Sequence, residues 1–297
     1  MNWQQRLNTA LAFIETHLEE KLELDSIAAT ACCSQFHFMR MFEVVSGMSV
    51  GDYIRRRRLS QAALALSSGR EKVIDVALRY GYDTPEAFAK AFKRLFGITP
   101  SEAAKPGSRL TTFPPLTVSV VLKGSQAMQY RMHTQENAIT LSGLGIRVCK
   151  RNQQQFKDIP LFWRESVKNG LVSKLWQSSG PMGMLGVCCE WAPATEEFSY
   201  LIAIDKPEGE TPPLEGLREL VLPATQYAIF EIEGQLPKAI QDAWQRIYTE
   251  WFPNSGYEHA GSPDFERYPP FAVDDPRGDP ASPHCVTEIW VPLRKGG

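Results

Sequence analysis

The strongest constraint on how this chain can fold is an internal repeat with a period of fifty residues. Residues 24–47 align with residues 74–97, so that apolar positions and helix-boundary residues coincide in the two copies. The aligned pairs are Asp25 with Asp75, Ala28 with Leu78, Phe38 with Phe88, Phe42 with Phe92, Ser34 with Thr84, and Gly47 with Gly97. Because core and boundary residues both recur, we expect the chain to build the same small helical motif twice.

The second copy lies in residues 72–100, KVIDVALRYGYDTPEAFAKAFKRLFGITP. Its first half has helical apolar spacing and stops at Gly81, which can adopt the left-handed conformation that ends a helix. Thr84 and Asp83 are N-cap candidates for a second helix, and Pro85 suits its first turn. That helix has a single apolar stripe, formed by Phe88, Ala91, Phe92, Leu95 and Phe96. The pattern predicts a helix-turn-helix, whose second helix can enter the major groove of DNA.

Positive charge is concentrated around the repeat. The whole chain carries 32 Lys+Arg and 34 Asp+Glu, whereas residues 40–94 carry 11 Lys+Arg and 6 Asp+Glu. This local excess favours a phosphate-bearing partner for the first part of the chain. A helix is predicted between the two copies, at residues 53–66, and it begins with arginines at positions 55–58. Each of these can contact a phosphate or pair with an acidic neighbour.

Other features of the sequence exclude several classes of protein. Residues 4–20 form an amphipathic helical pattern without a long apolar run, so we expect neither a signal peptide nor a membrane span, and a cytoplasmic protein. The six cysteines and five histidines show no CxxC or metal-ligand spacing. We therefore expect reduced cysteines, no bound metal and no cofactor.

Two stretches resemble the tandem helix-turn-helix domain of the AraC family of transcription regulators. They are LDSIAATACCSQFHFMRMFEVVSGMSVGDYIRRRRLSQA and VALRYGYDTPEAFAKAFKRLFGITPSE. In that family, two recognition helices held by a linker helix enter successive major-groove segments on one side of double-stranded DNA. By position, the resemblance implies a DNA-binding set of Gln35, Phe36, Met39, Arg40, Arg55, Arg57, Pro85, Glu86, Ala89, Lys90 and Lys93.

Within this set, side-chain chemistry suggests different roles. Arg40 can bond the O6 and N7 atoms of guanine, and Phe36 can pack on a thymine methyl group. Lys93 and the arginines at positions 55–58 suit phosphate contacts, which fix register without specifying sequence. The second recognition helix has few base-bonding side chains, because Pro85 and Ala89 cannot donate or accept hydrogen bonds through theirs.

After residue 100 the composition changes, so that we expect a multidomain chain in which an all-α tandem helix-turn-helix domain precedes an α+β domain. Residues 1–107 form the first domain, 108–115 a proline-rich linker or packed crossover, and 116–297 the second domain. Helices are predicted at residues 159–169 and 236–251. Strands are predicted at residues 117–122, 139–148, 186–190, 198–204, 217–222, 227–233 and 286–292. This spacing predicts two similar units, each with a helix backing a few strands.

The second domain resembles the gyrase-inhibitor-like (GyrI-like) effector-binding domain over residues 116–294. The stretches that carry the resemblance are LPATQYAIFEIEGQLPKAIQDAWQRIYTEWFPNSGYE, PDFERY and EIWVPLR. It implies a small-molecule effector, often a lipophilic cation, held between the paired units by aromatic side chains and a buried carboxylate. The implied effector residues are Glu288 as anchor, with Trp290, Tyr227, Trp244 and Trp191 as ring walls.

Alternatives remain open. Glu288 can instead form an ion pair with Arg147, Arg164 or Arg294, and Trp244 can belong to the core. The leading hypothesis is an effector-controlled transcription regulator with RNA polymerase as a further candidate partner. The second domain can also be a ligand-free protein-interaction module, or a hydrolase of reactive small molecules with a glutamate base. The chain has no nucleophile elbow, P-loop, dinucleotide fingerprint or HExxH motif, so we expect no enzyme.

Overall fold

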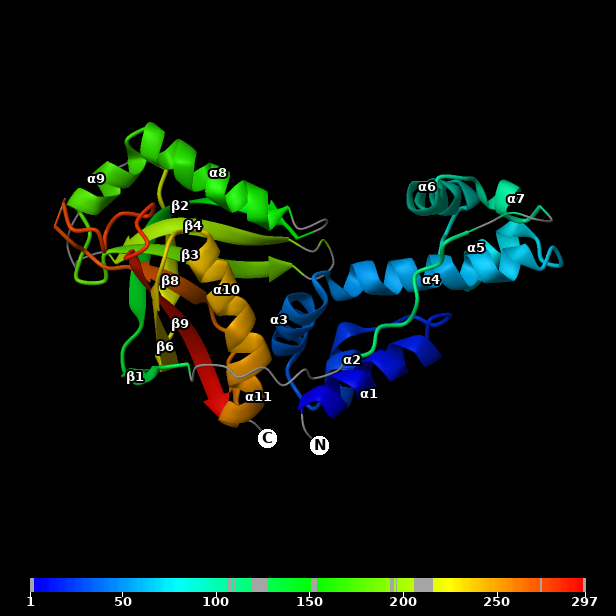
Figure 1. The fold of residues 1–297 in the computed structure, drawn as a ribbon, viewed down its shortest axis with the longest axis horizontal. Coiled ribbons are helices and arrows are strands. Elements are labelled where there is room, and N and C mark those ends of the chain that lie inside the picture. Colours follow the sequence, from blue (N-terminus) through cyan, green and yellow to red (C-terminus); the bar gives the residue numbers. More distant parts are fainter. Residues whose placement is uncertain are drawn as a thin grey trace. The chain divides into compact units, whose positions relative to one another are not determined.

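The computed structural model describes residues 3–105, 108, 110–118, 128–150, 154–192, 195, 197–205, 216–272 and 274–295. The chain forms two compact units, a helical one formed mainly by residues 3–118 and a sheet-containing one formed mainly by residues 128–295. Figure 1 shows the helices and strands of both units. Each unit has its own core. The expected fold class, an all-α tandem helix-turn-helix domain followed by an α+β domain, is confirmed.

The helical unit consists of two three-helix halves, α1–α3 and α4–α6, followed by the short helix α7. Its helices are α1 (Trp3–Thr16), α2 (Leu24–Thr30), α3 (Gln35–Ser46), α4 (Val50–Ser67), α5 (Val73–Arg79), α6 (Pro85–Phe96) and α7 (Pro100–Ala103). Both predicted helix-turn-helix motifs are present, α2 with α3 and α5 with α6. The helix α4 connects the two halves (Figure 1).

Local sequence explains why the two halves are alike. The Ser34 hydroxyl accepts a hydrogen bond from the His37 amide at 3.2 Å, and Thr84 does the same for Ala87 at 3.2 Å, so both recognition helices begin at a side-chain cap. Their ends are alike as well, because the helix-ending glycines adopt positive φ angles. These are 70° at Gly47 and 79° at Gly97.

The core of each half is built around a phenylalanine pair at i and i+4 of the recognition helix. The ring centroids of Phe38 and Phe42 lie 5.9 Å apart, and those of Phe88 and Phe92 lie 5.5 Å apart. All four rings are buried. Their burial orients each recognition helix, because one helix face must point inward and the opposite face is then left for a partner.

The second unit is a nine-stranded antiparallel sheet with the strand order β1-β6-β9-β8-β3-β4-β2-β5, and β7 pairs with β9 beside this path. Its strands are β1 (Arg131–Gln135), β2 (Ile139–Cys149), β3 (Met184–Ala192), β4 (Glu197–Asp205), β5 (Arg218–Leu222), β6 (Thr225–Glu233), β7 (Tyr257–His259), β8 (Asp264–Tyr268) and β9 (Val286–Lys295).

The sheet has two similar halves, as predicted. One consists of β2, β4 and β3, the other of β6, β9 and β8, and the antiparallel pair β3–β8 joins them. Each half also has an outer strand, and this strand comes from the part of the chain directly before the other half. The strand β1 comes directly before β2 but pairs with β6, and β5 comes directly before β6 but pairs with β2. The two halves therefore exchange their outer strands.

Helices of both halves cover the same face of the sheet. Residues of α8 and α9 pack on a cluster that contains Tyr200 and Ile202, and α10 places Trp244 near Glu266. Strand pairing puts Ile202 and Glu266 on one face, because both are paired with Gly186. The helices are α8 (Gln155–Lys168), α9 (Leu171–Gln177) and α10 (Lys238–Arg246), which continues as a π-helical turn η2 (Ile247–Trp251) and α11 (Phe252–Ser255).

Several elements differ from the sequence-based expectation. The helix α9 and the strands β1, β7 and β8 were not expected. The helix expected at residues 236–251 is divided into α10 and η2. Thr117 and Val118 are not in a strand, and the remaining residues of that predicted strand lie outside the described residues. The missed strands are short, and the burial pattern of β1 is too irregular to produce a clear alternation.

Candidate DNA-binding helices and effector site

The exposed face of α6 carries most of the residues expected to meet DNA. Glu86, Lys90 and Lys93 are exposed, and Pro85 and Ala89 are half-buried. No ion pair between these charged residues appears among the described residues, and the opposite face of the helix is filled by the buried phenylalanines. This arrangement leaves two lysines and a small residue on one accessible face, which suits close approach to a groove lined with phosphates.

The face of α3 is less open than expected. Gln35, Phe36 and Arg40 are half-buried, which is compatible with contact through their outer atoms. Met39 is 8% exposed, so the expectation that it is exposed is wrong. A methionine at this place contributes apolar volume rather than a base contact.

The arginines of α4 have structural partners. Arg57 is 3% exposed, and its guanidinium bonds both carboxylate oxygens of Glu15 at 2.8 and 2.7 Å. Arg57 was expected to contact a DNA phosphate, and this expectation is corrected, because the group is buried and already paired. Arg55 forms an ion pair with Asp52 one helical turn earlier and is half-buried. Its phosphate contact stays a prediction.

Glu288, the expected effector anchor, is buried and fully bonded. Its Oε1 accepts from Arg131 at 2.6 Å, and its Oε2 accepts from Arg267 at 2.8 Å and from the Trp290 indole at 2.9 Å. Burial acts to raise the pKa of this carboxyl, but the three donors outweigh it, and the pKa is lowered. The ion-pair alternative for Glu288 is therefore what the structure shows, although its partners are Arg131 and Arg267 rather than those proposed.

The expected ring walls do not form one site. Tyr227 and Trp290 pack together with Phe265 in a buried cluster on the face opposite to the helices. Trp244 lies on the helix-bearing face. Trp191 lies near Phe198, with 6.3 Å between the ring centroids, and belongs to the margin of the core under α8 and α9. The five residues expected to hold an effector are thus divided between two faces of the sheet.

A different carboxylate, Glu266 on β8, lies among aromatic side chains on the helix-bearing face. Its Oε2 accepts from the Tyr268 hydroxyl at 3.0 Å and the Tyr200 hydroxyl at 3.2 Å, and its Oε1 accepts from the Trp244 indole at 3.4 Å. The Trp163 indole on α8 donates to the Tyr200 hydroxyl at 2.8 Å. We call these five residues the Glu266 cluster. It brings together side chains from α8, α10, β4 and β8.

The environment of Glu266 differs from that of Glu288. Every donor to Glu266 is uncharged, and no basic side chain of the described residues bonds it. Burial raises the pKa of Glu266. The hydrogen bonds from Tyr268, Trp244 and Tyr200 act to lower it but do not compensate, and the charge of Asp264 adds to the rise. Burial also raises the pKa of Tyr200 and Tyr268 well above the usual tyrosine range. Both tyrosines therefore stay protonated and donate to the carboxylate.

A glycine makes this cluster possible. Gly186 on β3 is paired directly with Glu266. A Cβ atom at this position would lie 2.2 Å from the Tyr200 hydroxyl and 3.1 Å from Glu266 Oε2, so any other residue would displace the Tyr200 hydroxyl from its place beside Glu266. At the junction of the two halves, one strand thus supplies a carboxylate and its neighbour leaves room for a ring hydroxyl.

Sequence reasoning missed four members of the Glu266 cluster. The segment PDFERY contains a usable signal, because Glu266 and Tyr268 are two residues apart and a strand places them on one face. Trp163 and Tyr200 each precede Glu266 by more than sixty residues, and their place in the cluster depends on the strand order. No local pattern encodes that order.

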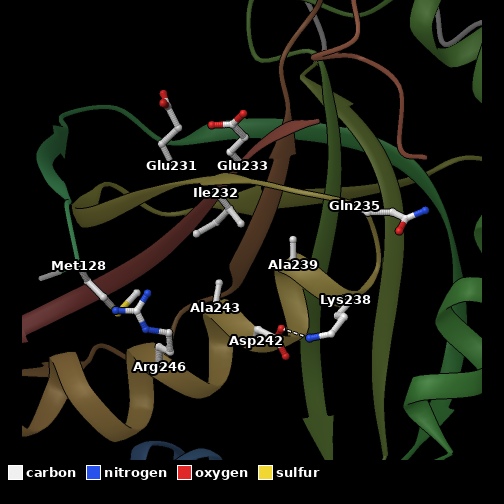
Figure 2. Close-up of a pocket in the computed structure, with 10 residues that line it drawn as sticks. All are labelled: Met128, Glu231, Ile232, Glu233, Gln235, Lys238, Ala239, Asp242, Ala243 and Arg246. Carbon is white, nitrogen blue, oxygen red and sulfur yellow. Dashed lines mark hydrogen bonds and ion pairs between the residues drawn. The ribbon is translucent and has the colours of Figure 1, made fainter. Parts of the chain in front are cut away.

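A hollow of about 420 Å³ opens between the end of β6 and the start of α10 (Figure 2). Ile232, Ala239 and Ala243 line its inner part, and Lys238 and Asp242 form an ion pair at its side (Figure 2). The remaining lining residues are Met128, Glu231, Glu233, Gln235 and Arg246. Its charged groups of both signs and its lack of aromatic rings do not suit a lipophilic cation.

Among the described residues, no group of three or more His, Cys, Asp and Glu could hold a metal ion. The six cysteines are free. Within the same residues, no helix is both long and apolar enough to cross a membrane.

Comparison with known proteins agrees with the two-unit organisation. Residues 134–293 match the family of integron-associated effector binding proteins, and residues 27–105 match a helix-turn-helix domain. The right origin-binding protein of Escherichia coli (strain K12) is 28% identical over 301 residues, which cover 96% of both chains.

Two shorter relatives match the helical unit. The HTH-type transcriptional activator AarP of Providencia stuartii is 42% identical over 95 residues, covering 32% of this chain and 70% of that protein. Regulatory protein SoxS of Escherichia coli (strain K12) is 34% identical over 102 residues, covering 34% of this chain and 95% of that protein. The chain therefore belongs to the DNA-binding AraC-type transcription regulators, and its second domain to the GyrI-like, integron-associated effector-binding family.

Proposed function

We propose that the chain is a transcription regulator whose second domain binds a small lipophilic cation at the Glu266 cluster, and that this binding biases DNA binding by the first domain. The observation that carries the proposal is the unneutralised carboxylate of Glu266, which has only uncharged donors although it is surrounded by aromatic rings. Glu266 is half-buried, and a carboxylate that is partly removed from water without a cation beside it is costly, so a bound cation would reduce that cost.

The chemistry of the cluster favours a delocalised cation over a small ion. The rings of Trp163, Trp244, Tyr200 and Tyr268 attract positive charge through their faces, and a cation with an apolar surface loses little hydration when it is buried. Trp163, Trp244 and Tyr268 are half-buried, so part of each side chain is accessible to solvent. At Glu288, by contrast, a ligand would have to displace two arginines.

The test is a titration of the full-length protein with tetraphenylphosphonium, a neutral aromatic compound and an organic anion, followed by tryptophan fluorescence. We expect saturable quenching by the phosphonium only, because Trp244 bonds Glu266 and Trp163 bonds Tyr200 within the same cluster. Glu266→Gln should abolish the response. Glu288→Asp, which keeps a charge for Arg131 and Arg267, is the control and should retain it. No response of the wild type, or an unchanged response of Glu266→Gln, would overturn the proposal.

A second candidate function, hydrolysis of a reactive small molecule, is favoured by the raised pKa of Glu266 and by two protonated tyrosine hydroxyls beside it. In such a reaction the carboxylate would act as general base for water and a tyrosine hydroxyl would polarise the substrate. Turnover of strained cyclic electrophiles that is lost in both Glu266→Gln and Tyr268→Phe would support it. Binding without turnover would leave the regulator proposal in place.

For DNA, we propose that α3 contacts bases through Gln35, Phe36 and Arg40, and that α6 contacts DNA mainly through Lys90 and Lys93. Pro85, Glu86 and Ala89 border this contact, and Arg55 meets the backbone. For the residues of α3 and α6, support comes from their placement on the helix faces that the buried phenylalanine pairs leave outward. Arg57 and Met39 are left out because both are buried.

A further inference from the structure

The chain that follows α7 lies against the helical unit and is bonded to it at several points. Its last described residue, Val118, is held by the Asn8 side chain of α1. The Val118 amide donates to Asn8 Oδ1 at 2.9 Å, and its carbonyl accepts from Asn8 Nδ2 at 3.0 Å and from Gln4 Nε2 at 3.0 Å. One asparagine thus pairs with both backbone groups of a residue that belongs to no helix or strand.

Earlier residues of the same segment are bonded to α4. The Phe113 amide donates to the Ser60 hydroxyl at 2.9 Å, and Ser60 is 0% exposed. The Phe113 carbonyl accepts from the Arg57 guanidinium. The Leu116 amide donates to the Tyr53 hydroxyl at 3.2 Å. Because Ser60, Arg57 and Tyr53 follow one another backward along α4, the segment runs antiparallel to this helix (Figure 1).

The groups that hold the segment are themselves fixed. Glu15 on α1 accepts from the Tyr53 hydroxyl at 2.7 Å, and it also binds the Arg57 guanidinium. The Phe113 ring lies edge-on to Tyr53, with 6.2 Å between the centroids. At the other end, Leu110 packs on the core formed by α4, α5 and α6. The segment therefore contacts both halves of the helical unit, from the second core to α1.

We propose that residues 110–118 form a strap that fixes the angle between the two helix-turn-helix halves, and that Asn8 and Ser60 are positioning residues for the spacing at which α3 and α6 meet DNA. Without the strap, the halves are held by α4 and by its bonds to the first half, such as those of Arg57 to Glu15, so that one half has more freedom to move against the other. A second connection removes this freedom before DNA is bound, so less conformational entropy is lost on binding.

The test uses the full-length chain and a duplex selected by the wild-type protein from a random library. The double variant Asn8→Ala/Ser60→Ala removes three of the side-chain bonds to the strap and leaves every proposed DNA contact unchanged. Ser67→Ala is the matched control, because the Ser67 hydroxyl bonds only the Leu64 carbonyl of its own helix α4. Amide hydrogen exchange of residues 110–118 reports whether the strap is loosened.

We expect faster exchange of the strap in the double variant and about tenfold weaker binding of the selected duplex. Affinity for duplexes that carry only one half-site should not change. A base pair inserted between the half-sites moves them about 3.4 Å further apart and rotates one relative to the other by about 35° around the DNA axis. This insertion should weaken the wild type strongly and the double variant much less, because a pivoting pair of halves tolerates altered spacing.

Three results would overturn the proposal. Unchanged exchange in the double variant would show that Asn8 and Ser60 do not hold the segment. A loosened strap with unchanged sensitivity to spacing would show that it does not set the angle between the halves. An equal loss of affinity in Ser67→Ala would attribute the effect to α4 itself.

Discussion

Consecutive arginines of α4 have different surroundings, and these decide what each can do. Arg57 is buried against Glu15, and Arg58 donates to the carbonyls of Leu18 and Glu20, where the chain leaves α1. Both bind α4 to the first half. Arg40 on α3 is half-buried and belongs to a recognition helix. A charge count over the helical unit therefore overstates the positive charge available to DNA.

Two arginine substitutions should accordingly have opposite effects. Arg57→Ala leaves the Glu15 carboxylate without its partner, so we expect a loss of about 3 kcal/mol in the free energy of unfolding. Arg40→Ala should lower the free energy of unfolding less than Arg57→Ala, because Arg40 is half-buried rather than buried, and it should weaken binding of the selected duplex by about 1–3 kcal/mol. Chemical denaturation and DNA titration of both variants check this. A stable Arg57→Ala that has lost DNA binding would contradict the assignment.

Glu266 should make the stability of the protein depend on pH. Its folded pKa is raised above the value of 4.5 for an ordinary glutamate, so its contribution is fully present below that pH and is lost as the pH rises through the folded pKa. Glu266→Gln does not titrate. We expect equal melting temperatures for the two proteins near pH 4.5 and a melting temperature about 3 °C higher for Glu266→Gln at pH 8, which corresponds to about 1 kcal/mol. A difference that does not change with pH would contradict this.

At the level of elements, the strand β8 gives two carboxylates, Glu288 and Glu266, different surroundings. Alternation along the strand places Arg267 on one face, where it neutralises Glu288, and Glu266 on the other, where the neighbouring position of β3 is Gly186. The two faces of this short strand thus differ. On one face Arg267 is paired with Glu288, and on the other Glu266 has only uncharged donors.

The pairing of β3 with β8 gives a direct test of this arrangement. Gly186→Ala inserts a methyl group where the Tyr200 hydroxyl lies, so the bond from Tyr200 to Glu266 should break. We expect at least about tenfold weaker phosphonium binding, because the ring and the carboxylate move apart. Gly170→Ala is a control for the loss of a glycine, since a Cβ there meets nothing within 4 Å, although its φ of 72° adds backbone strain. Unchanged binding by Gly186→Ala would show that the cluster geometry does not matter.

Features that depend on residues close together in the sequence could be predicted, whereas features that depend on distant residues could not. The helices of the repeat are encoded by caps and glycines a few residues apart, such as Ser34 and Gly47, and both were predicted. The partners of Glu288 were not, because Arg131 is 157 residues away and lies on a strand with no clear pattern. Alternation showed that Glu288 and Trp290 share a face. It could not show that the helices cover the other one, or that Glu288 is already paired with two arginines.

For the whole molecule, effector control requires that two separate units influence each other. If a phosphonium cation changes the affinity for DNA by some factor, DNA must change the affinity for the cation by the same factor. We expect factors of about 5 to 150 in both directions. Fluorescence titrations of the cation with and without the selected duplex, and DNA titrations with and without the cation, check this. Unequal factors, or coupling that persists in Glu266→Gln, would contradict control through this site.

The exchange of outer strands between the halves of the sheet has a consequence for synthesis of the protein. The strand β1 pairs with β6, so that Arg131 meets Ile229 almost 100 residues later in the chain. At ribosomal rates of about 5–20 residues per second, β1 is made roughly 5 to 20 s before its partner exists. During this interval β2 can already pair with β4 and β5 while β1 waits. The pairing of β1 with β6 at the edge of the sheet can therefore form only when most of the chain has been synthesised.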